Sequence, residues 1–236
     1  MIDEKLRQGN FTSSNVFRLV GTPGAAATYI KEKMYERYLG RSIEMGAKSS
    51  SMTWGSFLEK RVFDNLPMGY EMQHKKTHQH PKLKCLVGTT DFLVPGKKVS
   101  ELKCFEPKNF ASYVSALLTE DTEHIKKEHP KEYWQIVSNA MIHGVPRGEA
   151  IVYMPYESEM EDIRSLMQKE YYLMQMDMTP ADMYYLSLKS NSELATLPDD
   201  SKFKNLNIFE FEIPVNDIIL LTKKVMEAEK LLNNGV

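Results

Sequence analysis

Residues 86–105 read LVGTTDFLVPGKKVSELKCF, and this stretch decides the fold. Two apolar segments flank a Pro-Gly pair, which predicts a β-hairpin. Side chains alternate between the two faces of a strand, so Glu101 and Lys103 project on one side while Leu102 and Cys104 project into the core. The second strand is therefore expected to have one charged face and one packed face.

The face on which Asp91 lies depends on the length of the loop between the strands, because a shift of one residue in the pairing register moves every side chain of a strand to the opposite face. A three-residue connection over 95–97 pairs Asp91 with Glu101, whereas a two-residue turn pairs it with Ser100. We predict the three-residue connection, or an equivalent bulge. Two opposed carboxylates repel unless a cation lies between them, and Mg²⁺ prefers carboxylate oxygens. The alternative is that Asp91, Glu101 and Lys103 form the solvated face of an exposed hairpin.

The composition is that of a soluble globular protein: 236 residues, of which 42% are hydrophobic and 26% charged. This length suits a single domain, 1–236, or one core with an appendage. No apolar run reaches the roughly 18 residues of a membrane span, and the first ten residues lack the apolar core of a signal peptide, so we expect a cytoplasmic protein without membrane contact. The net charge of −2 excludes a globally basic nucleic-acid binder.

The two cysteines, Cys85 and Cys104, are expected to be free thiols in core strands, and they are too few to ligate an iron–sulfur cluster. The spacing of apolar residues predicts helices over 16–20, 25–39, 53–66, 131–143, 159–176 and 215–233, a short helix from 179, and strands over 150–154 and 208–213. Residues 106–130 are polar and are expected to run over the surface of the protein.

Polar residues near the N-terminus have two interpretations. Arg7 and Gly9 precede a cluster that contains Thr12 and Ser14, and a helical pattern follows. Hydroxyl groups there suit plain helix capping, whereas free N–H groups with a nearby arginine also suit a phosphate.

Two further polar residues lie beside apolar helical stripes. Glu59 could merely form a capping box with Ser56 at the start of a helix, and Gln135 could be an ordinary surface glutamine. The segment MQHKKTHQHPKLK over 72–84 suits a solvated or phosphate-contacting loop better than a zinc site formed by its three histidines, His74, His78 and His80, because no cysteine or acid cluster accompanies them.

These residues occur in a recognisable order. In chain order they are the segment R-x-G-x-x-T-x-S over 7–14, Gly55-x-x-x-Glu59, Asp91, Glu101-Leu102-Lys103, Gln135 and the strand A-I-V-Y-M-P ending at Pro155. The order resembles the PD-(D/E)XK nuclease superfamily, and it is most similar to the lambda-exonuclease-type viral recombinase family over about residues 5–156. The chain departs from the family name's pattern at Thr90, which replaces the proline before the first acid.

The resemblance implies an α/β fold with a central mixed β-sheet flanked by helices, a restriction-endonuclease-like core over about 5–156 with helical and strand C-terminal additions over about 157–236. It implies a Mg²⁺-dependent DNA exonuclease, with Mn²⁺ able to substitute. The metal ligands would be Glu59, Asp91, Glu101 and the Leu102 carbonyl. Lys103 would position or deprotonate the attacking water and stabilise developing charge, and Gln135 would orient Lys103 or the water; these two residues with the three acids form the catalytic set.

The resemblance also implies that Arg7, Thr12 and Ser14 bind the 5′-terminal phosphate of duplex DNA and so set a 5′→3′ direction in phage-type recombination. A single-strand annealing protein and a homo-oligomeric ring are further expected partners. The alternatives are an endonuclease of restriction or repair type and a non-catalytic DNA-binding or scaffold protein on the same fold.

Overall fold

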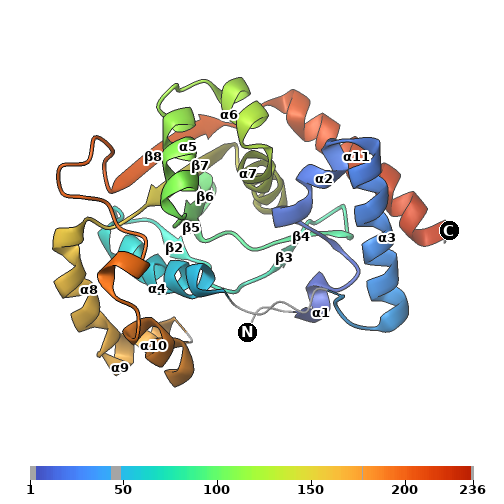
Figure 1. The fold of residues 1–236 in the computed structure, drawn as a ribbon. Coiled ribbons are helices and arrows are strands. Elements are labelled where there is room, and N and C mark those ends of the chain that lie inside the picture. The colour runs from blue at the N-terminus through green and yellow to red at the C-terminus, as the bar shows by residue number, and fades with distance from the viewer. Residues whose placement is uncertain (1–3, 44–48, 177, 235–236) are drawn as a thin grey trace.

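The computed structural model describes residues 4–43, 49–176 and 178–234, which form two β-sheets surrounded by helices (Figure 1). The strands are β1 (Phe11–Thr12), β2 (Glu71–Met72), β3 (His78–Gln79), β4 (Leu86–Gly88), β5 (Phe92–Val94), β6 (Lys98–Lys103), β7 (Arg147–Tyr153) and β8 (Leu206–Glu212). The main sheet has the order β2-β5-β6-β7-β8, and the smaller sheet has the order β1-β4-β3. The main sheet is mixed, because β6 and β7 are parallel and its other neighbouring strands are antiparallel.

The helices cover both faces of the main sheet. Their bounds are α1 (Glu4–Arg7), α2 (Phe17–Val20), α3 (Pro23–Leu39), α4 (Ser50–Asn65), α5 (Pro107–Leu117), α6 (Thr122–Glu128), α7 (Pro130–His143), α8 (Met160–Met167), α9 (Glu170–Gln175), α10 (Pro180–Ser187) and α11 (Val215–Asn234), with short 3₁₀ helices η1 (Ser13–Asn15), η2 (Glu157–Glu159) and η3 (Asn191–Glu193). None of these helices is both long and apolar enough to cross a membrane.

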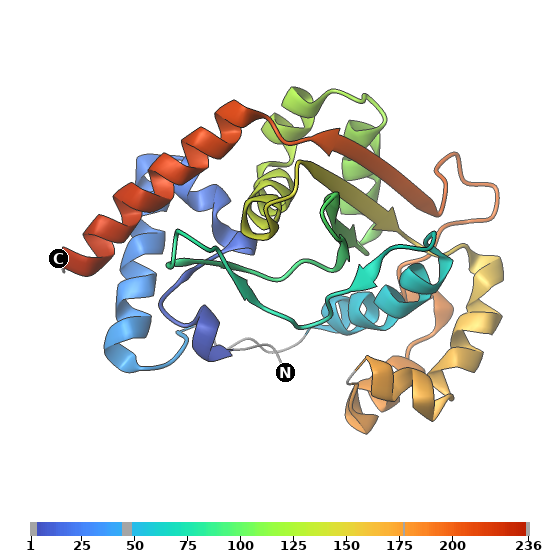
Figure 2. The same cartoon turned by 180° about the vertical axis from the view of Figure 1, so that it is seen from behind.

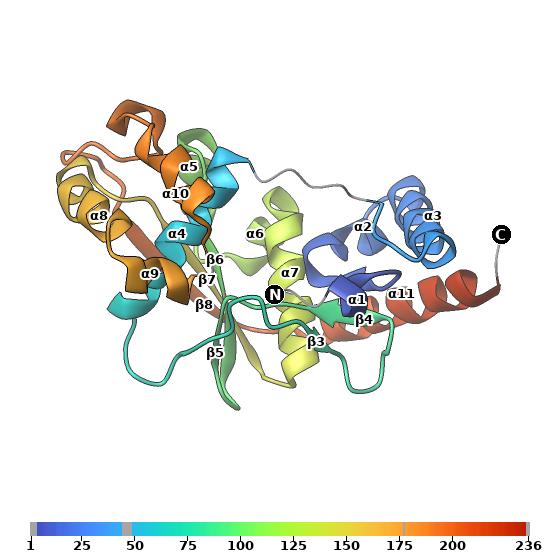
Figure 3. The same cartoon turned by 90° about the horizontal axis from the view of Figure 1, so that it is seen from below.

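Two hydrophobic cores form, one on each face of the sheet. Figure 3 shows α4 and α8 to α10 on one side and α6, α7 and α11 on the other. On the α4 side, Leu102 of β6 packs with Phe57 of α4. On the α7 side, Val99 of the same strand packs with Val137 of α7. The predicted α/β fold with a flanked mixed sheet is confirmed, and β6 lies at its centre.

The C-terminal third belongs to the same layers as the rest of the chain. Strand β8 extends the main sheet beside β7 over seven residue pairs, and α11 packs on the α7 side (Figure 2). The additions expected over about 157–236 thus include an edge strand of the main sheet, Leu206–Glu212, close to the strand predicted over 208–213.

Several local predictions were wrong. Residues 106–130 contain α5 and α6 and are not irregular, because Phe110 and Ile125 are apolar anchors that bury in the core. The predicted helix over 159–176 is divided into η2, α8 and α9. The apolar segment before the Pro-Gly pair is also divided, since β4 joins the smaller sheet and only β5 pairs with β6. The cysteines are free, as predicted, but both lie outside the strands.

Candidate functional site

The connection between β5 and β6 has the predicted three-residue length. Val94 pairs with Lys98, and the backbone N–H of Lys97 donates to the carbonyl of Val94 at 3.0 Å. Gly96 within this connection has a φ of 69°, which glycine adopts without steric cost. The same register, extended by one residue, places Asp91 opposite Glu101. The predicted length of the connection is thus confirmed, and the shared face of the two acids follows by extension of that register.

Asp91 lies in a bend just before β5, where its backbone and side chain are both held. Its Oδ2 accepts a hydrogen bond from the Leu102 N–H at 2.7 Å, and its carbonyl accepts one from the Gln73 N–H at 2.9 Å. The preceding residue, Thr90, is fully buried and donates its hydroxyl to the Ser100 carbonyl at 3.0 Å. Threonine thus supplies a hydrogen bond that a proline in this position could not.

Glu101 and Lys103 face helix α7, where two amide side chains meet them. Gln135 Nε2 donates to Glu101 Oε2 at 2.6 Å, and Lys103 Nζ donates to Gln135 Oε1 at 3.1 Å. Asn139, one helical turn later, donates to the other oxygen of Glu101. Glu101 is only 1% exposed, so the charged face of the hairpin is not a solvated one.

The alternative interpretations of Gln135 and Glu59 are excluded by position. Gln135 is buried against Glu101, not displayed on the surface. Helix α4 begins at Ser50 with Ser49 as its N-cap, seven residues earlier than Ser56 would require, so Glu59 is in mid-helix and caps nothing. Its Oε2 lies 3.0 Å from Nδ1 of His74, and its Oε1 is buried with no hydrogen-bond partner among the described residues.

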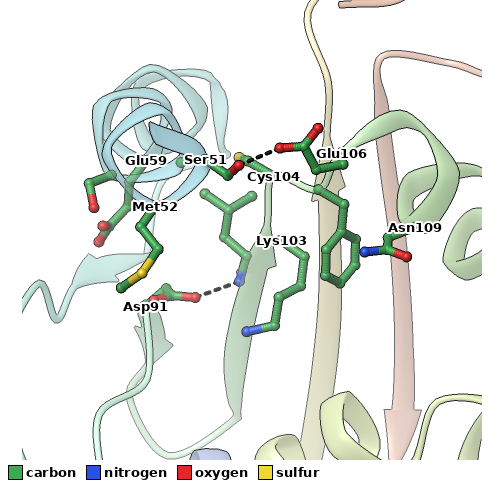
Figure 4. A pocket seen from close by; sticks show the side chains of 12 residues that line it. Ser51, Met52, Glu59, Asp91, Lys103, Cys104, Glu106 and Asn109 are labelled. Atoms are coloured by element: carbon green, nitrogen blue, oxygen red, sulfur yellow. Dashed lines mark hydrogen bonds between the residues drawn. The ribbon is translucent and has the colours of Figure 1, made fainter. Parts of the chain in front are cut away.

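A cavity of about 530 Å³ opens at the end of β6 and is lined by α4, by Asp91 and by the start of α5 (Figure 4). Glu59, Asp91 and Lys103 line it together. Glu101 and Gln135 are not among the lining residues, because they lie beneath Lys103 against α7. On the opposite rim are Glu106 and Asn109, with Glu106 accepting a hydrogen bond from Ser51.

The acids of this site are strongly perturbed. Burial and the neighbouring carboxylate of Glu101 hold the pKa of Asp91 well above its ordinary value. Burial also raises the pKa of Glu101, against the opposing attraction of Lys103. For Lys103, burial alone would lower the pKa, but the attraction of Glu101 and Asp91 outweighs it and the pKa is raised. Crowded buried carboxylates of this kind are typical of functional sites.

The donor chemistry fits a hard divalent cation such as Mg²⁺. Asp91, Glu59 and Glu101 offer oxygen ligands, and the unpaired buried Oε1 of Glu59 lacks a partner that a cation would supply. Within the described residues, no three His, Cys, Asp or Glu side chains are grouped closely enough to hold a metal. The reason is local: both Glu101 oxygens face amides of α7. The histidines of 72–84, within the described residues, are likewise not grouped with two further ligands as a zinc site would require.

The N-terminal segment lies against α7 and β4. Thr12 is the N-cap of η1 but its side chain does not cap the helix; its hydroxyl instead lies 3.3 Å from the Tyr29 hydroxyl and 3.4 Å from the Ser14 hydroxyl. Ser13, between them, contacts the hydroxyl of Ser138 on α7 at 2.9 Å. Arg7 ends α1, partly buried. The segment is thus joined directly to the helix that carries Gln135.

Two residues of the site were not predicted. A signal for Asn139 was available, because it follows Gln135 by four residues, and residues i and i+4 share a helix face. His74 was considered only with the other histidines of its loop. Its contact with Glu59 depends on packing between segments 15 residues apart, which no local pattern indicates.

The helix that carries Glu59, the bend and strand that carry Asp91 and Glu101-Leu102-Lys103, and the crossover helix that carries Gln135 together define a PD-(D/E)XK nuclease fold. The chain belongs to the family of YqaJ-like viral recombinase domains, whose model matches residues 4–146. A sequence comparison with curated proteins finds no match.

Solved structures show the same fold at low sequence identity. The chain is similar to LHK-Exo in complex with dAMP, with 16% identity over 98% of this chain and 91% of that one and a TM-score of 0.62. For the alkaline exonuclease LHK-Exo from Laribacter hongkongensis the values are 17%, 97%, 90% and 0.60. For a phage-related exonuclease from Haemophilus somnus 129PT they are 13%, 95%, 94% and 0.61.

Proposed function

We propose that the protein is a Mg²⁺-dependent exonuclease that degrades linear duplex DNA in the 5′→3′ direction during phage-type recombination. The observation that carries this proposal is the joining of Lys103, Gln135 and Glu101 by hydrogen bonds directly beside the cavity that Asp91 and Glu59 line. Membership of a viral recombinase family and the fold shared with exonucleases support it.

The residues that would hold Mg²⁺ are Asp91, Glu101, Glu59 and the carbonyl of Leu102, and Mn²⁺ would substitute. When bound, the metal lowers the pKa of a water molecule and neutralises charge that develops on the phosphate. Asp91 enters this set with one oxygen already fixed by the Leu102 N–H, so that its other oxygen is left for the ion.

Lys103 acts on the water and the phosphate. Its ammonium group is anchored by Gln135 and lies 3.6 Å from Glu101, which fixes its direction into the cavity. From there it positions the attacking water and stabilises the additional negative charge of the transition state. Gln135 acts as a positioning residue, because its amide holds Lys103 and Glu101 at the same time.

Direction is set by the N-terminal segment. Arg7, Thr12 and Ser14 bind the 5′-terminal phosphate, through a guanidinium group, hydroxyl groups and the N–H groups at the start of η1. The absence of a side-chain cap on η1 supports this, because its first N–H groups are not taken by Thr12. A single-strand annealing partner and a homo-oligomeric ring stay predictions from the family resemblance.

The experiment compares linear duplex DNA with 5′-phosphorylated ends against covalently closed circles, each with Mg²⁺ and after chelation by EDTA. We expect release of nucleotides from the linear DNA only, and only with metal. Lys103→Ala should reduce the rate by about 10²-fold or more. The control Lys97→Ala changes an exposed lysine of the same hairpin and should leave the rate unchanged.

Two results would contradict the proposal. Unchanged nucleotide release by Lys103→Ala would remove the assigned site. Cleavage of closed circles as fast as linear DNA would indicate an endonuclease.

A further inference from the structure

His74 makes one polar contact with its ring, and the partner is Glu59. Nδ1 of His74 lies 3.0 Å from Oε2 of Glu59, and both side chains are largely buried, with exposed fractions of 15% and 12%. The other ring nitrogen, Nε2, is buried without a hydrogen-bond partner among the described residues. Among the described residues, Glu59 is therefore the one polar partner of the ring, whereas a purely structural histidine would be expected to satisfy both nitrogens.

The direction of this hydrogen bond follows from chemistry. Toward an ionised carboxylate Nδ1 acts as the donor, because such a carboxylate has no hydrogen to donate. This contact fixes Oε2 and so stops rotation of the carboxylate group. The second oxygen, Oε1, is then held in one direction, and it is the oxygen that has no protein partner.

The backbone around His74 is tied to the second acid of the site. The N–H of Gln73 donates to the carbonyl of Asp91 at 2.9 Å, which continues the pairing of β2 with β5. A turn follows, closed by a hydrogen bond from the Lys76 N–H to the Gln73 carbonyl at 2.8 Å. Within this turn Lys75 adopts a φ of 58°, a left-handed conformation that is strained for a non-glycine residue.

The position of His74 relative to Asp91 is therefore fixed by the backbone hydrogen bond of Gln73. Its position relative to Glu59 is fixed by the contact of the His74 ring. The strained residue, Lys75, directly follows His74, and a change of backbone direction at this point would move the His74 ring away from Glu59. Glu59 and Asp91, which both line the cavity, are thus positioned relative to each other by one segment, residues 73–76.

We propose that His74 is a positioning residue that orients the Glu59 carboxylate toward the metal site; this inference rests on the proposed function. Residues that hold the ligands of a metal in this way typically change metal affinity by about 10- to 100-fold when they are removed. His74 does not touch the reacting atoms and acts only through Glu59.

The test measures Mn²⁺ binding to the full-length protein without DNA, by isothermal titration calorimetry or electron paramagnetic resonance. His74→Ala and His74→Gln should weaken Mn²⁺ binding by about tenfold or more. They should raise the Mg²⁺ concentration for half-maximal nuclease rate by a similar factor, with the rate at saturating Mg²⁺ nearly kept. His74→Asn should bind nearly as the unchanged protein does, because its amide nitrogen replaces Nδ1 as the donor.

A matched control and a double variant make the test specific. His80→Ala alters a histidine of the same region whose Nδ1 accepts from the Lys82 and Leu83 N–H groups, and it should leave Mn²⁺ affinity unchanged. In a protein that already carries Glu59→Gln, adding His74→Ala should cause no further loss of affinity. The thermal unfolding midpoint of each variant is recorded, so that a general loss of stability is recognised.

Unchanged Mn²⁺ affinity in His74→Ala would overturn the inference, and so would an Asn variant that loses as much affinity as the Ala variant. The proposed function fails in a different way. If Asp91→Asn binds Mn²⁺ as tightly as the unchanged protein, the metal site itself is wrong, whatever His74 does.

Discussion

Lys103 of the central strand donates a hydrogen bond to Oε1 of Gln135 at 3.1 Å. The same amide donates to Glu101 from its nitrogen, so one side chain contacts both Glu101 and Lys103. We expect Gln135→Ala to reduce the nuclease rate by about 10- to 100-fold, because Lys103 loses the contact that directs it. Mn²⁺ affinity should change little, since Asn139 still holds Glu101. Single-turnover kinetics and calorimetry check the two effects.

The control for this variant is Gln79→Ala, which removes an exposed amide whose only described role is a hydrogen bond to the Lys84 carbonyl. It should leave the nuclease rate unchanged. A Gln135→Ala protein with full activity would show that Lys103 needs no anchor.

Gly88 permits the closest approach in the site, and we expect Gly88→Ala to destabilise the protein by about 2–3 kcal/mol. A Cβ atom there would lie 2.1 Å from Oδ1 of Asn139 and 2.1 Å from Oγ of Ser13, so these side chains would have to move. Gly24, in the first turn of α3, has no atom within 4 Å of such a Cβ, and Gly24→Ala should stabilise the protein by about 0.5–1 kcal/mol. Urea denaturation measures both, and effects of the same sign would contradict the prediction.

His143, at the end of α7, should make the protein less stable in acid. Burial and the neighbouring His78 lower the pKa of His143 to about 4. Its ordinary pKa is about 6.5, so between these values the unfolded chain binds a proton that the folded protein does not. The contribution of this residue to stability is therefore complete above pH 6.5 and is lost as the pH falls toward 4, by about 2 kcal/mol after allowance for solvent screening.

The free energy of unfolding, measured in urea at several pH values, checks this. His143→Asn should flatten the pH dependence between 6.5 and 4, even where the variant is less stable overall. An equal slope in the variant and the unchanged protein would assign the acid sensitivity to other groups.

Arg7 should determine the preference for phosphorylated ends. We expect Arg7→Ala to reduce the ratio of rates on 5′-phosphorylated and 5′-hydroxyl duplex by about tenfold or more, because a charged hydrogen bond contributes about 1.5–3 kcal/mol. Mn²⁺ binding should be unaffected. Lys5→Ala, an exposed basic residue on the same helix α1, is the matched control and should keep the ratio. A preference that survives in Arg7→Ala would exclude this residue from the phosphate site.

Much of the centre of the fold could be predicted from the sequence because charge and register constrain each other. The repulsion between Asp91 and Glu101 selected a three-residue connection over a two-residue turn, and the pairing of Val94 with Lys98 confirms that length. Helix α7 was predicted nearly to the residue, since Pro130 begins it and Gly144, with a φ of 63°, ends it.

Other features depend on contacts that a single stretch of sequence does not contain. In residues 106–130 the apolar positions that bury, such as Phe110 of α5 and Ile125 of α6, are interspersed with charged and polar residues that hide the helical pattern. Asp91 lies in a bend because β4 leaves the main sheet to pair with β1 and β3. The partnership of His74 with Glu59 likewise appears only when the loop over 73–76 folds back onto α4.

The contact between Ser13 and Ser138 has a consequence for how the two ends of the site move. Gln135, Ser138 and Asn139 are three and four residues apart, so they lie on one face of a single turn of α7. In that turn Ser138 contacts Ser13 of the N-terminal segment. The amides of Gln135 and Asn139 in the same turn donate hydrogen bonds to Glu101. The segment proposed to bind the DNA end and the acid proposed to bind the metal are therefore held by one helical turn and not by loops, and we expect the thermal fluctuations of the two to be correlated.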